Sequence, residues 1–429
     1  MVAVAATNRR NARYSDSRAG FERLPVEPLA AALVFCLCIQ SLGSRVVLAE
    51  LALLGALLTI RWREGWRLLC ASFPFLLLPL LAVASAGWSD VPGISFRYGL
   101  QLLITVVMGT AIASTVPLPR IPLVVFIGTG LAMLIGIASG RTGGSLEGEV
   151  LIGFTGSKNQ IGYISLFWLS SSLCVAASSR SGWPLRIAAL ICVVPAIYMI
   201  WQAHATTALV SAIAAIGILG VLAAVSLLPS GGRLFCLCAM ALMLLPAAAA
   251  LPQIEAYADH IRSDVLQKDA GLTGRTLLWQ SADELIARRP VTGYGYKAIW
   301  MGQEGVGLLA RNGHTDGRSF HFHDTVRELR VDLGIPGLVL FLLPLGYVLI
   351  RAVPLLVAQV TPARAFLAVT LLLICLRLRT ELEIGPFLAD TVLLYVALAA
   401  ISRTPIGQAP PHRARSPMPI RSRRERKPA

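Results

Sequence analysis

The longest polar stretch of this chain lies between Leu251 and Gly334. Its two most distinctive segments are LTGRTLLWQSADELIARRPVTGYG, residues 272–295, and HFHDTVRELRVDLGIPG, residues 321–337. The sequence on both sides is strongly apolar, in runs long enough to cross a bilayer as helices. The polar stretch therefore interrupts a membrane-embedded chain, and it is the first place to look for a functional site.

Composition places the chain among integral membrane proteins. Of its 429 residues, 55% are hydrophobic and only 14% are charged. Because lipid offers no hydrogen bonds to the backbone, and because no alternating pattern indicates a barrel, the spans are expected to be helices. The sequence predicts an all-α integral membrane protein with about 12 transmembrane helices and a large extracytoplasmic loop. The expected spans are 28–43, 46–60, 68–87, 98–116, 121–139, 159–178, 185–202, 205–228, 233–251, 335–353, 363–379 and 384–402.

The positive charge has a distribution that indicates orientation in a membrane. The net charge is +15, but the Lys and Arg residues gather in the two tails and in alternate short loops. This pattern argues against nucleic acid as a partner and predicts a cytoplasmic location for both termini, with the long polar loop on the periplasmic side. The predicted organisation is a disordered basic tail (1–27), helices one to nine (28–251), a periplasmic loop (252–334), helices ten to twelve (335–402) and a second disordered basic tail (403–429).

A glycine-rich approach to the sixth span is the first candidate binding feature. Residues 153–162, GFTGSKNQIG, place Lys158 at the expected start of a helix. Free backbone N–H groups and a cation at a helix N-terminus suit an anion. An ordinary interfacial cap with a snorkelling lysine explains the same pattern equally well.

The long loop carries a second set of candidates. Residues 273–289 are expected to form an amphipathic helix along the surface, with Arg275 near its positive end. Its predicted buried stripe consists of Leu278, Ala282, Leu285 and Ile286. Arg275, together with Arg288 and Arg289, suits a phosphate or pyrophosphate, although a surface ion pair is the simpler alternative. Tyr294 lies in a glycine turn, where its ring is expected to be exposed and able to stack on a sugar.

Histidines supply the candidate for proton transfer. His323, beside Asp324, is a plausible general base, and Asp324 is expected to orient its ring. His321 lies two residues before His323, and on a regular backbone its side chain is expected to point elsewhere. His204, between the seventh and eighth spans, is either a group that faces a ligand or an interfacial residue. The eight cysteines lie in or beside spans, and the pairs Cys36/Cys38 and Cys236/Cys238 lack histidine partners. His321 and His323 with Asp324 could also be metal ligands, but no third strong ligand lies in range in the sequence, so no metal site is expected.

Taken in order, these segments resemble the O-antigen ligase and polysaccharide polymerase superfamily. The resemblance rests on residues 154–162, on 272–279 with 289–295, and on 323–338. It covers roughly residues 150–345, and within the superfamily the chain looks most like exopolysaccharide polymerases of succinoglycan type.

The resemblance implies a fold similar to the C-type membrane glycosyltransferases and a reaction with inversion, without metal or other cofactor. The implied donor is an oligosaccharide on undecaprenyl pyrophosphate, and the implied acceptor is a sugar hydroxyl at the periplasmic face of the bacterial inner membrane. Membrane lipid, chain-length regulators and export proteins are the implied partners.

The family motifs assign roles to particular residues. The resemblance implies that Arg275 binds the pyrophosphate and that His323 assists the acceptor hydroxyl. Lys158, Asn159, His204, Arg289, Tyr294 and Asp324 complete the candidate set, as substrate-binding residues. The sequence departs from the family at Asp324, where relatives often carry Asn, and at 204–207, where many carry a basic pair.

Three other readings stay open. A ligase would transfer the glycan to lipid A core instead of to another repeat unit. A transporter or flippase would bind its substrate near the bilayer midplane, where this chain has few charges, with Glu50 and Asp390 as the main candidates. A non-catalytic assembly subunit would require neither His323 nor Arg275.

Overall fold

Apolar helices make up nearly all of the described chain. The structure is a computed structural model that describes residues 26–60, 70–145, 148–243, 271–302 and 321–406, with single positions at 246, 250, 253, 305, 307 and 308. The two predicted basic tails and a large part of the predicted periplasmic loop therefore lie outside the described residues.

The helices follow the apolar runs of the sequence. In the first part of the chain they are α2 (Glu27–Leu37), α3 (Ser44–Ile60), α5 (Phe73–Ala84), α6 (Pro92–Thr115), α7 (Ile121–Ser139), α8 (Lys158–Ala177), α9 (Trp183–Gln202) and α10 (Thr206–Val225). Another apolar helix covers Ser230–Met243. After it come α12 (Gly271–Arg288), α13 (Ala298–Met301), α15 (Thr325–Ala358), α16 (Pro362–Arg377) and α17 (Ala389–Arg403). Short 3-10 turns lie at Gln40–Leu42 (η1), Ser85–Gly87 (η2) and Leu118–Arg120 (η3).

The expectation of a helical multi-pass membrane protein is confirmed. Among the described residues, 6 helices are long and apolar enough to cross a membrane, and they begin at Pro92, Leu118, Lys158, Trp183, Thr206 and Thr325. The remaining expected spans also contain helices, but these are shorter; α2, for example, has 11 residues. The figure of about 12 spans stays a prediction.

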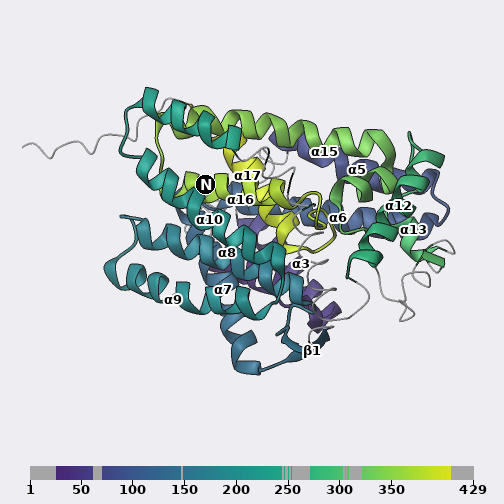
Figure 1. The fold of residues 1–429 in the computed structure, drawn as a ribbon, viewed down its shortest axis with the longest axis horizontal. Helices are drawn as coiled ribbons and strands as arrows, with labels where there is room; N and C mark the ends of the chain where they lie inside the picture. The colour runs from purple at the N-terminus through teal and green to yellow at the C-terminus, as the bar shows by residue number, and fades with distance from the viewer. Residues whose placement is uncertain are drawn as a thin grey trace, which may run out of the picture.

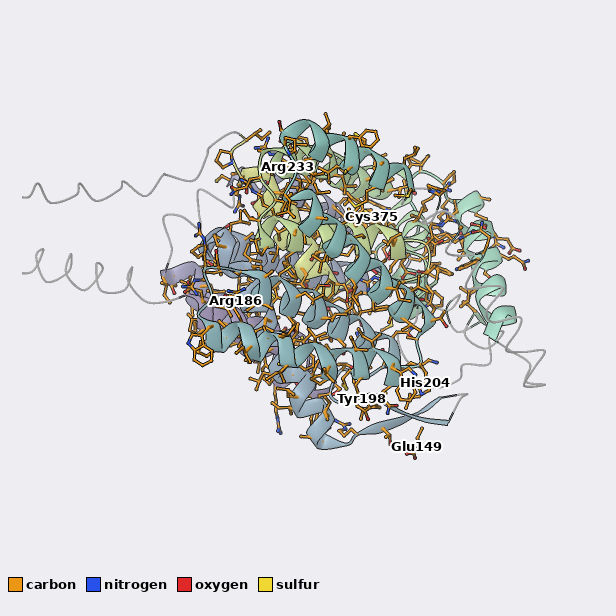
Figure 2. The ribbon with its side chains drawn as sticks, turned by 60° about the vertical axis from the view of Figure 1, so that its left-hand side comes forward. Glu149, Arg186, Tyr198, His204, Arg233 and Cys375 are labelled. Carbon is orange, nitrogen blue, oxygen red and sulfur yellow. The ribbon has the colours of Figure 1, made fainter. Side chains whose placement is uncertain are left out.

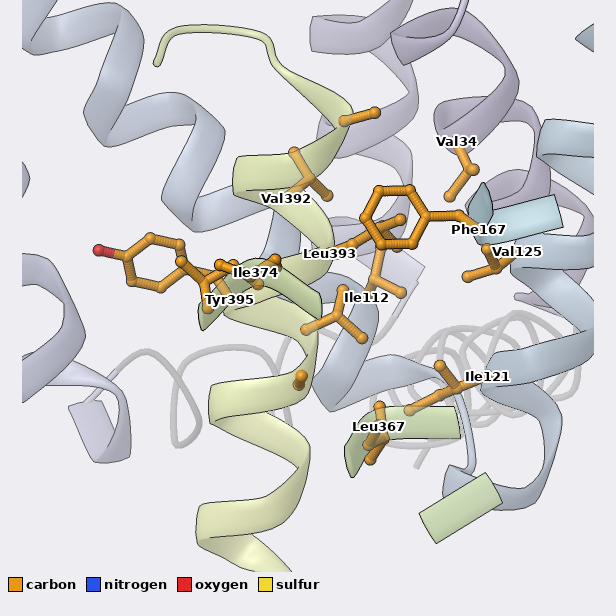
Figure 3. Close-up of a cluster of buried hydrophobic side chains, with 14 of the residues drawn as sticks. Val34, Ile112, Ile121, Val125, Phe167, Leu367, Ile374, Val392, Leu393 and Tyr395 are labelled. Atoms are coloured by element: carbon orange, nitrogen blue, oxygen red, sulfur yellow. The ribbon is translucent and has the colours of Figure 1, made fainter. Parts of the chain in front are cut away.

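The core of the bundle lies around α8. This helix packs against α7, α9, α10 and α16, and its Phe167 and Trp168 side chains are fully buried. Figure 3 shows Phe167 among aliphatic side chains from several other helices, including Val34 of α2, Ile112 of α6 and Leu393 of α17. Because so many helices meet on α8, the residues at its two ends have fixed positions.

A small hairpin departs from the all-helical expectation. Strands β1 (Thr142–Ser145) and β2 (Gly148–Leu151) pair antiparallel, with Thr142 opposite Leu151. The two strands follow α7, which ends at Gly140 in the left-handed conformation. The hairpin bridges α7 and α8, and its backbone groups bond to each other because no helix continues there.

A second, smaller core lies at one end of α15. There α12 and α13 pack against the first turns of α15, to the right in Figure 1. The predicted stripe of α12 is buried, and it contacts Tyr294, Trp300 and Phe322 within one apolar cluster. The amphipathic helix is therefore confirmed, and its apolar face packs on protein.

Helix α15 is interrupted at Gly334, whose backbone is not helical. Its φ of 65° breaks the helix between residues 325–333 and residues 335–358. Before the break, Val331 packs in the smaller core while Leu329 and Leu333 pack in the main core. A side chain could not fit at Gly334, because an added Cβ would lie 2.0 Å from the carbonyl oxygen of Val291. The break is therefore built into the packing between residues 290–295 and α15.

The labelled side chains of Figure 2 mark the two ends of the bundle. Figure 2 shows Arg186 near the start of α9, with Tyr198 near its other end and His204 just beyond. Arg233 also lies away from His204 and Glu149 in this view. We call the end that carries His204 and the start of α8 the site end.

Candidate functional site

Three segments that are distant in sequence converge at the site end. They are the start of α8 (157–160), the segment before α15 (321–325) and the connection between α16 and α17 (378–388). Thr325 ties the last two together, since its backbone N–H donates to the carbonyl of Leu378 at 2.8 Å and its hydroxyl donates to that of Glu381 at 2.7 Å. The same hydroxyl accepts from the backbone N–H of Glu383 at 2.8 Å.

The centre of the site is His323 beside a buried carboxylate. His323 Nδ1 lies 3.5 Å from Glu381 Oε2, and the other carboxylate oxygen accepts from Asn159 Nδ2 at 3.3 Å. The Glu381 side chain is 6% exposed and the His323 side chain is 18% exposed, so the carboxylate is buried and the imidazole beside it is partly accessible to solvent. A hydrogen on Nδ1 would face this carboxylate, and Nε2 would then be the proton acceptor. The group is therefore suited to general base chemistry.

The backbone at His323 explains where sequence reasoning failed. Its φ is 50°, a left-handed conformation that a regular helix or strand does not contain. As a result His321 folds back: its Nδ1 accepts from the His323 backbone N–H at 3.1 Å, and the two ring centroids are 4.0 Å apart. The expectation that His321 points elsewhere is wrong, because the two rings contact each other.

Asp324 has a different role from the one expected. Its carboxylate caps α15 by accepting from the backbone N–H of Arg327 at 2.9 Å. It also accepts from Arg327 Nη1 at 2.7 Å and from Arg379 Nε at 3.0 Å. The carboxylate that faces the imidazole is that of Glu381, so Asp324 instead holds two arginines beside the site.

Arg327 connects the site to α12. Arg327 also pairs with Asp283 of α12, with Nε 2.9 Å from Oδ1, and its guanidinium lies over the Trp279 ring at 5.2 Å. Trp279 in turn donates to the carbonyl of Phe322 at 3.0 Å. Arg275 lies one helical turn before Trp279 on α12, but its side chain is outside the described residues. The helix that carries the predicted pyrophosphate ligand is therefore anchored to the histidine segment.

Two predicted residues lie on the α8 side. Ser157 caps α8 by accepting from the backbone N–H of Gln160, so Lys158 and Asn159 occupy its first turn. Asn159 contacts Glu381 directly and so belongs to the site. His204 has a φ of 47°, is exposed and lies 6.4 Å from the Trp201 ring, measured between centroids. It is at the same end, on the turn that packs against Gly162 of α8.

Arg289 and Tyr294 lie at the contact between residues 290–295 and the break in α15 at Gly334, which we call the clasp. Tyr294 is 3% exposed, so the expectation of an exposed ring is wrong. Arg289 lies over this ring at 4.4 Å and pairs with Asp90 at 3.0 Å. The glycine turn bonds to the broken part of α15, where Tyr294 N–H donates to Val331 at 2.9 Å and Gly295 N–H to Asp332 at 2.9 Å. The ring is buried because the turn joins two elements instead of protruding.

A buried ion pair behind the site was not expected from the sequence. Lys297 Nζ lies 2.6 Å from Glu328 Oε1, which also accepts from Trp300 Nε1 at 3.1 Å. Burial lowers the pKa of Lys297, but the neighbouring carboxylates of Glu328 and Asp332 together outweigh burial and raise that pKa above its ordinary value. The second oxygen of Glu328 accepts from the backbone N–H of Phe322 at 2.9 Å, next to His323. Glu328 therefore holds the histidine segment in place.

A second buried charge cluster supports the α16–α17 connection. Arg377 is fully buried; its Nη2 lies 3.0 Å from Glu383 and 2.7 Å from Asp390, and the guanidinium faces the Tyr163 ring at 4.2 Å. A buried arginine of this kind restricts the loop that carries Glu381, because each partner comes from a different element.

Comparison with known proteins points to one superfamily. The family model described as O-antigen ligase matches residues 165–342. A curated protein described as exopolysaccharide production protein ExoQ, from Rhizobium meliloti (strain 1021), is 28% identical over 266 residues, or 61% of this chain. The matched region spans 60% of the length of that relative. The family region contains His323, Arg275 and the clasp around Gly334, and it stops before Glu381.

Proposed function

Because the chain is related to the O-antigen ligase and polysaccharide polymerase superfamily, we propose that it is an exopolysaccharide polymerase. It transfers an oligosaccharide repeat unit from undecaprenyl pyrophosphate to a sugar hydroxyl of another repeat unit. The proposed location is the periplasmic face of the bacterial inner membrane, with both termini in the cytoplasm. The observation that carries the proposal is the pairing of His323, which is partly exposed, with the buried Glu381 beside the arginine-bearing start of α15.

The proposed reaction is a single displacement at the anomeric carbon, which inverts its configuration. The acceptor hydroxyl attacks this carbon while the bond to the pyrophosphate oxygen breaks. His323 Nε2 takes the hydroxyl proton, and Glu381 stabilises the imidazolium that forms. The electron pair of the broken bond leaves on undecaprenyl pyrophosphate, so the site must place cations near that group.

The cations proposed to bind the pyrophosphate lie around this pair. Arg275 is the residue that the family motif indicates. Arg379 is a further candidate that the motif does not include: its side chain is 52% exposed while its Nε is held by Asp324. A guanidinium fixed on one edge presents its other donors in a fork that suits phosphate oxygens. We propose no metal ion and no other cofactor for the reaction.

The test uses the purified full chain in detergent with lipid-linked repeat unit as the only sugar substrate. A ladder of products on a gel identifies a polymerase, whereas product only after addition of lipid A core identifies a ligase. His323→Ala is expected to reduce the rate by roughly 10²–10⁴-fold. His321→Ala is expected to give an intermediate rate because it removes only a bond to the backbone of His323.

His412→Ala, a histidine variant in the predicted cytoplasmic tail, controls for preparation effects. Retention of the wild-type rate by His323→Ala would contradict the proposal. Loss of wild-type activity on addition of a chelator would contradict its metal-independent form.

A further inference from the structure

The end of the bundle opposite the candidate site contains a cavity. Its volume is about 460 Å³, and it is lined by the turn before α7, the turn between α8 and α9, and the turn between α15 and α16. Three of the helices that reach it, α8, α15 and α16, carry site residues at their other ends. With 20 residues, α8 is about 30 Å long, close to the thickness of a bilayer core. The cavity and the site therefore belong to opposite membrane faces.

The lining of the cavity is strongly basic. Arg120, Arg180 and Arg364 contribute to it, together with the hydroxyl residues Ser178, Ser179 and Thr361. The lining residues, all in the described part of the chain, include no aspartate or glutamate. Within that part, none of the three arginines forms an ion pair, although Arg364 Nη1 donates to the carbonyls of Leu355 and Gln359. The described residues around this cavity thus supply no acidic partner for its positive charge.

Four helix ends reach the cavity. Helix α16 begins at the cavity with Pro362, and Thr361 caps it by accepting from the backbone N–H of Arg364. Helix α7 begins there as well, directly after Arg120. The N-terminal ends of these two helices carry partial positive charge, and the C-terminal ends of α8 and α15, which also reach the cavity, carry partial negative charge. The net positive charge of the lining therefore comes from its arginines.

We propose that this cavity binds a phosphate-bearing ligand at the membrane face opposite the candidate catalytic site. The ligand chemistry is a phosphate group in contact with Arg120 and Arg180, with an attached moiety over the apolar part of the lining, which includes Leu123 and Val360. An anionic phospholipid headgroup and a soluble phosphate compound share this chemistry. Binding joins the three turns that line the cavity, so it stabilises the folded bundle.

The experiment uses the purified full chain with two probes. One is phosphatidylglycerol in mixed micelles, compared with phosphatidylcholine; the other is inorganic pyrophosphate. Thermal unfolding and native mass spectrometry report binding. The double variant Arg120→Gln/Arg180→Gln removes two exposed charges that pair with nothing in the described chain, so its fold is expected to persist.

The control is Arg186→Gln. Arg186 lies on the same face of the molecule but outside the lining, where its Nε donates to the carbonyl of Ala176. Because the candidate catalytic site is also proposed to bind pyrophosphate, the pyrophosphate measurement is repeated with Arg275→Ala, which should leave binding to the cavity intact.

The wild type and Arg186→Gln are expected to bind at least one probe, and the double variant to bind it on the order of tenfold more weakly or worse. Preference for phosphatidylglycerol identifies the lipid headgroup as the source, and preference for pyrophosphate identifies a soluble compound. Equal binding by the double variant and the wild type, or binding of neither probe by the wild type, overturns the proposal. Loss of pyrophosphate binding in Arg275→Ala alone assigns that binding to the candidate catalytic site, and it overturns the proposal unless the double variant has lost binding of phosphatidylglycerol.

Discussion

At the residue scale, the candidate site depends on buried acids whose partners come from distant parts of the chain. Glu381 lies between His323 and Asn159, whereas Asp324 holds Arg327 and Arg379. A carboxylate beside an imidazole orients the ring and stabilises its protonated form. Glu381 is thus expected to act through His323 as a positioning residue.

Glu381→Gln is expected to lower kcat by roughly ten- to a hundredfold with little change in KM, because the amide keeps the shape but not the charge. Steady-state rates with lipid-linked repeat unit measure both constants. Glu149→Gln, an exposed acid in the hairpin, is the matched control. An increase in KM at constant kcat would instead place Glu381 in substrate binding.

Lys297→Met is expected to destabilise the protein by about 3–5 kcal/mol, since Glu328 is left as an unpaired buried charge. The double variant Lys297→Met/Glu328→Gln should be destabilised less than the single variant Lys297→Met. Chemical unfolding in detergent measures the free energy of unfolding of both variants.

Because the pKa of Lys297 is raised in the folded protein, its contribution to the free energy of unfolding is complete below the ordinary lysine pKa. This contribution is lost only as the pH rises through the folded value. The contribution should therefore be constant between about pH 7 and 9. Equal costs for the single and double variants would show that the pair is not coupled.

At the scale of elements, the clasp between residues 290–295 and the break in α15 positions the smaller core. Besides the bonds of Tyr294 and Gly295, the Ile335 N–H donates to the carbonyl of Pro290 at 3.1 Å. Gly293 also has positive φ, and an added Cβ would lie 2.6 Å from the backbone of Asp332. The glycines of these motifs therefore permit close backbone contact, and their part in any chemistry is indirect.

Gly334→Ala is expected to destabilise the smaller core by about 1–3 kcal/mol or more, because the added methyl group meets the Val291 carbonyl and φ is positive. Gly346→Ala in the same helix is the control, since nothing lies within 4 Å of an added Cβ there. Thermal unfolding compares the two. Equal unfolding temperatures for both variants would mean that the clasp contributes nothing to stability.

The sequence predicted the elements better than it predicted their contacts. Helices α6 to α10 were predictable because long apolar runs allow few other structures in lipid. The contact between His321 and His323 was not predictable, because it depends on the left-handed backbone conformation of His323, which no local sequence pattern requires. The pairing of His323 with Glu381 joins positions 58 apart in the chain, and only the packing of α15 against α16 and α17 brings them together.

At the scale of the whole molecule, the site and the basic cavity lie at opposite ends of shared helices. This arrangement agrees with the orientation that the distribution of Lys and Arg predicts. In a chain whose eight native cysteines are replaced, Glu284→Cys on α12 should react with an impermeant thiol reagent applied to intact spheroplasts. Ser179→Cys, beside the cavity, should react only after permeabilisation. The reverse labelling pattern would mean that the predicted topology is inverted.

The break at Gly334 has a consequence for how the protein responds to its lipid surroundings. A continuous helix of 34 residues would transmit any change of tilt along its whole length. Here the segment that carries Asp324 is bonded through Thr325 to the connection between α16 and α17, while the segment beyond Ile335 packs in the bundle, and the break at Gly334 lies between the two. The spatial relation between His323 and its arginines is therefore expected to stay constant in membranes whose acyl chains differ in length.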